Sequence, residues 1–181
     1  IAAIMPHQEP FLFLETASIS PGVATGTYII KGSESFLQGH FKDRPIFPAS
    51  IMIEALGQLA VFYLLAADDE KLHQDVDCNS IYFASCDGVR CHRICKPGDI
   101  LTLQVKPRNI RHPLALFHGS ITVDGEKTSV AEEIKLAFDY EQAILPKISQ
   151  GSSNGNGTTR VVANQAGITH KAGRLSNPEK V

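Results

Sequence analysis

The segment from Ser50 to Ala66 constrains the fold of this chain more than any other part of the sequence. Thirteen of its 17 residues are apolar, so a helix here must be buried around most of its circumference. The four exceptions are Ser50, Glu54, Gly57 and Gln58, and their spacing places them on one helical face. We therefore expect a buried central helix that carries a narrow polar stripe.

Strand-like segments lie on both sides of this helix in the sequence. They cover residues 11–19, 23–31, 79–92, 99–110, 114–123 and 127–139. Turn signals separate them, and the strongest hairpin signal is Asp124-Gly125. The chain has no alternating strand–helix rhythm, so a parallel sheet is not expected. One long helix among five or six antiparallel strands predicts an α+β fold in which the sheet wraps the helix.

The end of the chain differs in composition from the rest. Residues 149–160 contain no apolar side chain, which is typical of linkers and tails. We expect a folded domain over residues 1–144 and a polar tail or linker over residues 145–181. The net charge of −2 gives no reason to expect a nucleic-acid partner. The longest uninterrupted apolar run, Leu59–Ala67, is shorter than the roughly 20 residues that a bilayer requires, so no membrane span is expected.

Four cysteines fall in one short window, at positions 78, 86, 91 and 95. Their spacing contains no Cys-x-x-Cys pair, so free thiols are favoured over a zinc site that would include His92. Free thiols are typical of a reducing compartment, and we expect a cytoplasmic protein without a bound metal.

A histidine-containing loop precedes the helix. Residues 39–50 read Gly-His-Phe-Lys-Asp-Arg-Pro-Ile-Phe-Pro-Ala-Ser, and Glu54 and Gln58 follow on the helix. This resembles the β-hydroxyacyl-ACP dehydratases of FabZ type, whose pattern is Gly-His-Phe-Pro-Gly-x-Pro-x-x-Pro-Gly, then an apolar stretch and Glu-Ala-x-x-Gln. The opening Met5-Pro6-His7 and the segment 81–99 also fit that family. The resemblance therefore covers about residues 1–140.

The resemblance implies a hot-dog fold, in which an antiparallel sheet wraps a long helix. Members of the family form homodimers, often assembled as trimers of dimers, and each site takes its histidine from one protomer and its acid from the other. The implied partner is acyl carrier protein (ACP), which presents the acyl chain on a phosphopantetheine arm. No metal, nucleotide or flavin cofactor is implied.

The chemistry of the implied reaction suits two residues of the motif. Dehydration of a 3-hydroxyacyl thioester to the trans-2-enoyl thioester needs a base for the C2 proton and an acid for the C3 hydroxyl. His40 is the candidate base, and Glu54, among apolar neighbours, is the candidate acid. Backbone amides at the helix start, around Ala49 and Ser50, would bind the thioester oxygen with the help of the helix dipole.

Other candidate residues have two possible roles each. Gln58 could orient Glu54 or only fill the polar stripe. Phe41, Tyr82 and Phe83 are candidates for contact with the acyl chain, with core packing as the alternative for Phe83. His7 could pack the N-terminal segment near the site or contact the reacting groups. A basic stretch could form a docking rim for ACP or a solvated strand end, and its candidate residues are Arg90, Arg93 and Lys96.

The sequence departs from the family pattern at two places in the motif. Lys42-Asp43 replaces Pro-Gly in the loop, and Ala49 replaces a glycine whose amide binds the thioester carbonyl in the family. Two alternatives to the dehydratase interpretation stay open. One is a hot-dog thioesterase, against which the loop histidine argues, and the other is a degenerate module that binds acyl-ACP without catalysis.

Overall fold

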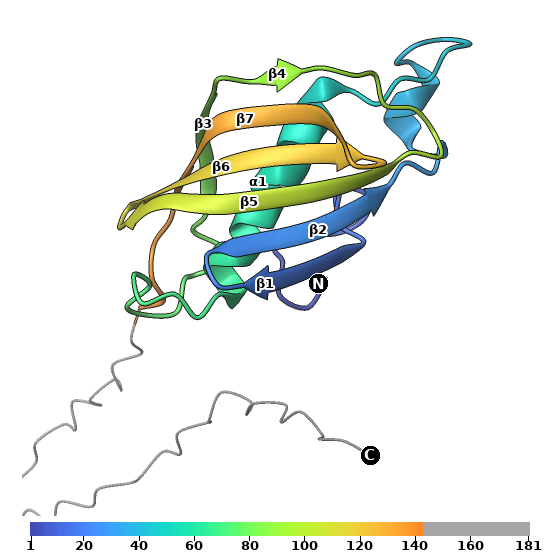
Figure 1. Cartoon of the computed structure of the whole chain (residues 1–181). Coiled ribbons are helices and arrows are strands. Elements are labelled where there is room, and N and C mark those ends of the chain that lie inside the picture. The colour runs from blue at the N-terminus through green and yellow to red at the C-terminus, as the bar shows by residue number, and fades with distance from the viewer. Residues whose placement is uncertain (143–181) are drawn as a thin grey trace, which may run out of the picture. The chain divides into compact units, whose positions relative to one another are not determined.

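A long helix, α1 (Ala49–Ala66), lies against one face of an antiparallel sheet (Figure 1). The computed structural model describes residues 1–142. Its strands are β1 (Thr16–Ser20), β2 (Val23–Ile29), β3 (Tyr82–Asp87), β4 (Arg90–Cys91), β5 (Ile100–Arg111), β6 (Leu114–Val123) and β7 (Glu126–Ala137). They are ordered β1-β2-β5-β6-β7-β3, and β4 pairs with β7. Strands β1 and β3 are therefore the two edges.

The period-two pattern of the strands decides which face of the sheet meets the helix. Along β6, buried residues alternate with half-buried ones, and Ala115, Phe117 and Ile121 point inward. Gly119 packs against the helix, where an added Cβ atom would lie 3.0 Å from Leu56 Cδ1. A larger residue here would have to displace the side chain of Leu56 or Ile134, so the glycine lets α1 pack closely against β6.

Helix α1 is the core of the fold. All ten residues from Ala55 to Leu64 are buried. Among the helices of residues 1–142, α1 is the one that is long and apolar enough to cross a membrane. The uninterrupted apolar run 59–67 is too short to do so. The sheet packs against it and 61% of the helix is buried within the fold, which identifies it as the core helix of a globular domain.

The hot-dog architecture is confirmed, and the helix ends within one residue of its predicted bounds at both ends. Two strand predictions were wrong. The first strand begins at Thr16 rather than Phe11, because Leu12, Phe13 and Leu14 are buried consecutively and do not alternate. The predicted strand 79–92 is two strands, β3 and β4, divided by a turn at Gly88, so the sheet has seven strands rather than five or six.

One short element was not predicted. A 3-10 helix, η1 (Ser35–Gln38), leads into the histidine loop, which continues to the start of α1. The amide of Phe47 donates a hydrogen bond of 2.8 Å to the carbonyl of Cys95, which ties this loop to the segment after β4. The predicted tail lies outside the described residues, and the domain boundary at 144 stays a prediction.

Candidate active site

The histidine loop holds His40 by both its ring and its backbone. The ring Nδ1 lies 2.8 Å from the carbonyl oxygen of Ile46, and the Ile46 amide donates to the His40 carbonyl, also at 2.8 Å. A carbonyl can only accept, so Nδ1 carries the proton of the neutral ring and Nε2 keeps a free lone pair. The ring of Phe41 stacks on His40 with a centroid distance of 4.2 Å. The loop therefore presents Nε2 as a base in a fixed orientation.

The unusual Lys42-Asp43 pair fits the turn that follows His40. Asp43 has a φ of 62°, in the left-handed region where the family pattern has glycine. Aspartate is one of the few other residues that adopts this conformation readily, because its short polar side chain interacts locally. Phe41 and Arg44 exchange two backbone hydrogen bonds of 3.1 and 3.0 Å across the turn. The substitution thus keeps the turn and adds charge to it.

Two backbone amides at the start of α1 are available to a ligand. Pro48 is the N-cap, and its carbonyl accepts from Ile51 at 3.1 Å and from Met52 at 3.2 Å. The amides of Ala49 and Ser50 find no acceptor within residues 1–142, and both residues are exposed. Ala49 is helical, so its methyl group introduces no backbone strain. Amides with this orientation, at the positive end of a helix, suit a developing oxyanion.

The polar stripe of α1 is a hydrogen-bonded unit. Gln58 is 1% exposed and accepts from the Phe13 amide at 2.8 Å. Its Nε2 donates to the Phe11 carbonyl at 3.0 Å and to Glu54 Oε1 at 2.9 Å. Gln58 therefore fixes the N-terminal segment and contacts the Glu54 carboxyl at the same time.

His7 is a neighbour of Glu54 that the sequence left undecided. Its Nε2 lies 3.7 Å from Glu54 Oε1, and its Nδ1 is buried without a hydrogen-bond partner among the described residues. Burial lowers the pKa of His7 below its ordinary value of 6.5, although the charge of Glu54 acts in the opposite direction. The ring therefore stays neutral at neutral pH. The Met-Pro-His sequence was the available signal, but only the fold reveals the contact.

His40 and Glu54 belong to two separate networks within one chain. No hydrogen bond or ion pair of residues 1–142 joins them, because His40 bonds inside its loop and Glu54 bonds to Gln58 and His7. Phe83 lies against the same helical face, where a Cβ atom on Gly57 would lie 2.9 Å from its ring.

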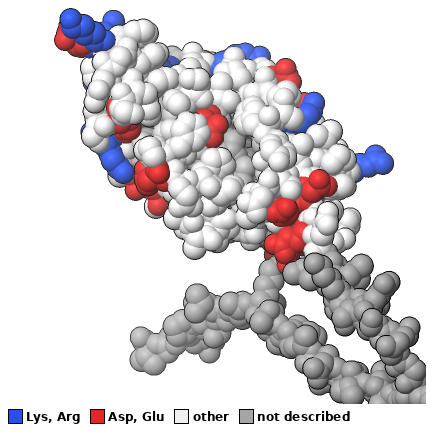
Figure 2. Space-filling model, turned by 180° about the vertical axis from the view of Figure 1, so that it is seen from behind, with Lys and Arg blue, Asp and Glu red and all other residues white. Residues whose placement is uncertain are grey.

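Aromatic side chains are exposed around this face of the domain. Phe41 is 54% exposed and Tyr82 is 65% exposed, and Phe83 is exposed in part. Figure 2 shows the side of the molecule turned away in Figure 1, where uncharged side chains predominate and acidic side chains lie in a few small groups. Exposed aromatic side chains such as Phe41 and Tyr82 are typical of an interface.

The predicted docking residues are less available than their charge suggests. Arg90 pairs with Glu132 at 2.6 Å. Arg93 lies 3.6 Å from both Asp99 and Glu126, whereas the side chain of Lys96 forms no ion pair within the described region. The local excess of positive charge is therefore partly neutralised inside the chain.

A second basic group lies on the outer face of the sheet. His118 on β6 pairs directly with Lys106 on β5. Burial lowers the pKa of His118, and the charges of Arg108, Lys106 and Lys127 lower it further, against a smaller opposite effect of Glu132. This group was not among the predicted site residues.

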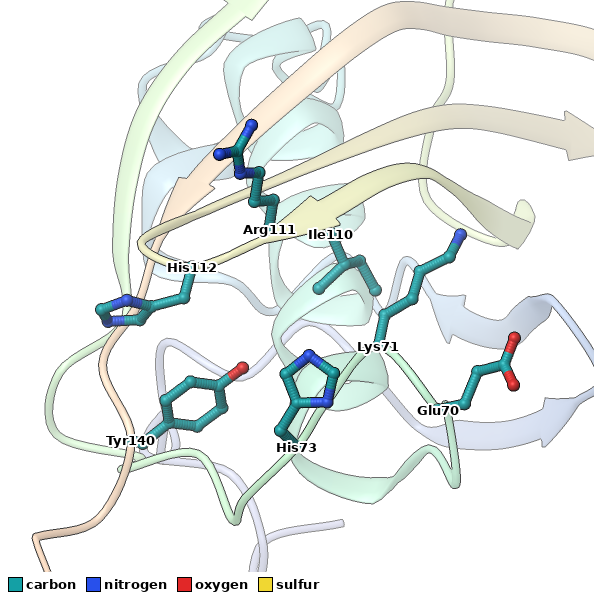
Figure 3. A pocket seen from close by; sticks show the side chains of 7 residues that line it. All are labelled: Glu70, Lys71, His73, Ile110, Arg111, His112 and Tyr140. Atoms are coloured by element: carbon teal, nitrogen blue, oxygen red, sulfur yellow. The ribbon is translucent and has the colours of Figure 1, made fainter.

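Figure 3 shows a surface pocket of about 470 Å³ that contains none of the predicted site residues. Its lining includes Lys71, His73, Arg111 and Tyr140. Within residues 1–142 no group of three or more His, Cys, Asp or Glu side chains is arranged to hold a metal ion.

Comparison with known proteins shows the family of this chain. Residues 5–132 match the FabA-like domain family. This chain belongs to that family. It is 34% identical over 145 residues to the 3-hydroxyacyl-(acyl-carrier-protein) dehydratase FabZ of Thermomicrobium roseum, which covers 79% of this chain and 93% of the relative. It is 35% identical over 151 residues to the FabZ of Bacillus pumilus, covering 82% of this chain and 96% of the relative. Within the FabA-like family it is therefore similar to FabZ over nearly the whole length of those relatives.

Solved structures agree on the fold. The chain matches the dehydratase heterocomplex ApeI:P of Xenorhabdus doucetiae with a TM-score of 0.50 and 18% identity, over 68% of this chain and 96% of that one. It matches a hypothetical thioesterase from Streptococcus pneumoniae with a TM-score of 0.53 and 11% identity, over 79% of this chain and 94% of that one. At these identities the two matches support the hot-dog fold alone.

Proposed function

We propose that this chain is a hydro-lyase that converts 3-hydroxyacyl-ACP to trans-2-enoyl-ACP. The identity with dehydratases named FabZ over most of the chain supports the reaction class. The observation that carries the assignment to particular residues is the His40 Nδ1 hydrogen bond to Ile46, because it makes Nε2 a base. The proposal places the protein in fatty-acid or related acyl-chain biosynthesis, as a soluble enzyme of the cytoplasm.

The proposed reaction uses three groups. His40 Nε2 removes the C2 proton, and the electron pair of that C–H bond forms the C2–C3 double bond as the C3–O bond breaks. The carboxyl of Glu54 gives its proton to the departing hydroxyl, which leaves as water. The amides of Ala49 and Ser50 stabilise the negative charge on the thioester oxygen. Transfer of the proton from His40 back to Glu54 through water restores the enzyme.

We further propose that a second copy of the chain completes each site. Within residues 1–142 no hydrogen bond or ion pair joins His40 to Glu54, and the His40 ring stacks on the exposed ring of Phe41. Edge strand β3 has a neighbour on one side only and carries Tyr82 and Phe83. A homodimer would cover these residues, with Phe41, Tyr82 and Phe83 beside the acyl chain. A trimer of dimers stays a prediction.

The chemistry is tested with 3-hydroxyacyl-ACP substrates of graded chain length, read by mass spectrometry. Loss of water supports the proposal, whereas release of the free ACP thiol would identify a thioesterase. Folded protein that neither dehydrates these substrates nor hydrates a crotonyl thioester would be a binding module. His40→Ala and Glu54→Gln should each lower turnover by about 10²–10⁴-fold. Full activity in either folded variant would refute the residue assignment.

The shared site is tested by mixing the two inactive variants. If each site combines His40 of one protomer with Glu54 of the other, refolded mixtures of His40→Ala and Glu54→Gln contain heterodimers with one intact site. Activity should reappear in the mixture. Native mass spectrometry verifies that heterodimers have formed, and inactive heterodimers would mean that the site lies within one chain.

A further inference from the structure

The two carboxylate oxygens of Glu54 have different contacts. Oε1 accepts from Gln58 Nε2 at 2.9 Å and faces His7 Nε2 at 3.7 Å. Oε2 has no hydrogen-bond partner among the described residues. The side chain of Glu54 is 27% exposed, so a ligand can reach it.

The surroundings of His7 decide which of its nitrogens carries the proton. Nδ1 is buried and finds no acceptor in residues 1–142, so a proton there would be an unsatisfied buried donor. The neutral ring therefore carries its proton on Nε2, which faces Glu54. Within the described region Glu54 on α1 is the charged group that acts on His7, and it does not overcome the effect of burial on the His7 pKa.

The position of His7 is set by the same segment that Gln58 anchors. Met5 is 3% exposed and sits in the core, and the Gln8 side chain donates to the carbonyls of Ala2 and Met5 at 3.1 Å each. Further along, Phe11 and Phe13 bond to Gln58. The ring of His7 is thus held between two anchors, beside the carboxyl.

We propose that His7 is a positioning residue which, together with Gln58, directs N–H groups at Glu54 Oε1 and so leaves Oε2 as the oxygen that exchanges the proton with the substrate. This inference rests on the proposed dehydratase function. An oxygen that already faces two N–H groups is the poorer site for a proton, so the acidic proton sits on Oε2. Oε2 is then the oxygen to align with the C3 hydroxyl.

The test compares two replacements of His7 with a control. His7→Phe keeps an aromatic ring and removes the donor, whereas His7→Gln keeps an N–H at a similar distance from the backbone. We expect His7→Phe to lower kcat about tenfold to a hundredfold with little change in KM, because the acid is misaligned. His7→Gln should recover most of that loss. His73→Phe, at an exposed histidine outside the site, should match the unmodified enzyme.

The pH profile separates positioning from packing. In His7→Phe the carboxylate loses the polar N–H group that lies 3.7 Å from Oε1, so the limb of the kcat profile that reports the acid should move to higher pH. A purely structural His7 would leave that limb in place. A folded His7→Phe variant with unchanged kcat and profile, or a His7→Gln variant as impaired as His7→Phe, would overturn the proposal.

A second measurement does not depend on turnover. In protein with ¹⁵N-labelled histidine, the ring shifts of His7 should report a proton on Nε2, and Glu54→Gln should change those shifts. A proton on Nδ1, or no response to Glu54→Gln, would refute the contact. If the unmodified enzyme fails to dehydrate 3-hydroxyacyl-ACP, the proposed function fails, and the ring shifts still decide whether His7 directs its proton at Glu54.

Discussion

Replacing Gln58 by methionine keeps the length of the side chain and removes three hydrogen bonds at once. The Phe13 amide then becomes a buried donor without a partner, since Phe13 is 1% exposed, and this costs about 1–3 kcal/mol. Phe11 is 52% exposed, so water can replace the bond to its carbonyl at little cost. The lost bond to the Glu54 carboxyl adds about 1 kcal/mol. We therefore expect Gln58→Met to lower the free energy of unfolding by about 2–4 kcal/mol.

Urea unfolding at one fixed protein concentration measures this loss, because the proposed dimer would make the unfolding midpoint depend on protein concentration. Gln104→Met is the matched control, since Gln104 is half-buried on β5 and its side chain forms no hydrogen bond within residues 1–142. The control should stay within about 0.5 kcal/mol of the unmodified protein.

A mutant cycle then divides the effect of Gln58 between its partners. In a Glu54→Ala background, Gln58→Met still removes the acceptor of the Phe13 amide but no longer removes a bond to the carboxyl. The residual loss should be about 1–3 kcal/mol. If Gln58→Met alone lowers the free energy of unfolding by less than about 0.5 kcal/mol, and the dependence of that free energy on urea concentration is unchanged, Gln58 does not anchor the N-terminal segment.

Three further predictions concern other parts of the domain. Gly57→Ala places a methyl group 2.9 Å from the ring of Phe83 and should displace that ring. Activity on long acyl chains should then fall more than activity on short ones, which measurements of kcat/KM for long and short substrates would reveal. The pKa of His118 is lowered in the folded protein, so the unfolded chain binds the proton more readily and stability should fall as the pH drops below about 6.5. His118→Gln should therefore make Tm depend less on pH between about pH 8 and pH 5. Reversing Arg90 and Arg93 to glutamate should raise KM for acyl-ACP several-fold and leave a small acyl thioester unaffected, and equal losses on both substrates would mean damage to the site itself.

The sequence was sufficient for the parts of the fold that depend on periodicity. The helix follows from its long apolar run, because it is buried around most of its circumference, and β6 follows from the alternation of its buried residues. The stretch 11–15 was mistaken for a strand because a short apolar run does not distinguish a strand from a buried loop. What makes it a loop is the bond from Phe13 to Gln58, a residue 45 positions away.

The candidate site could be predicted where the motif is contiguous, and less well where distant segments meet. His40, Glu54 and Gln58 were predicted from one stretch of sequence that resembles the FabZ motif, and the structure joins Gln58 to Glu54 by a hydrogen bond. The contact of His7 with Glu54 depends on how the N-terminal segment crosses α1, which no local pattern contains. The pairing of Arg90 with Glu132 depends likewise on the register between β4 and β7.

The hydrogen bond between the Phe47 amide and the Cys95 carbonyl links the histidine loop to a cysteine whose thiol can be alkylated and measured. Cys95 is fully buried, and burial together with the charge of Asp99 raises its pKa to about 11, so it stays a protonated, unreactive thiol while the loop is closed. The exposed Cys91 has no such protection from reagents. The alkylation rate of Cys95, relative to that of Cys91, would therefore report how often the loop that carries His40 opens.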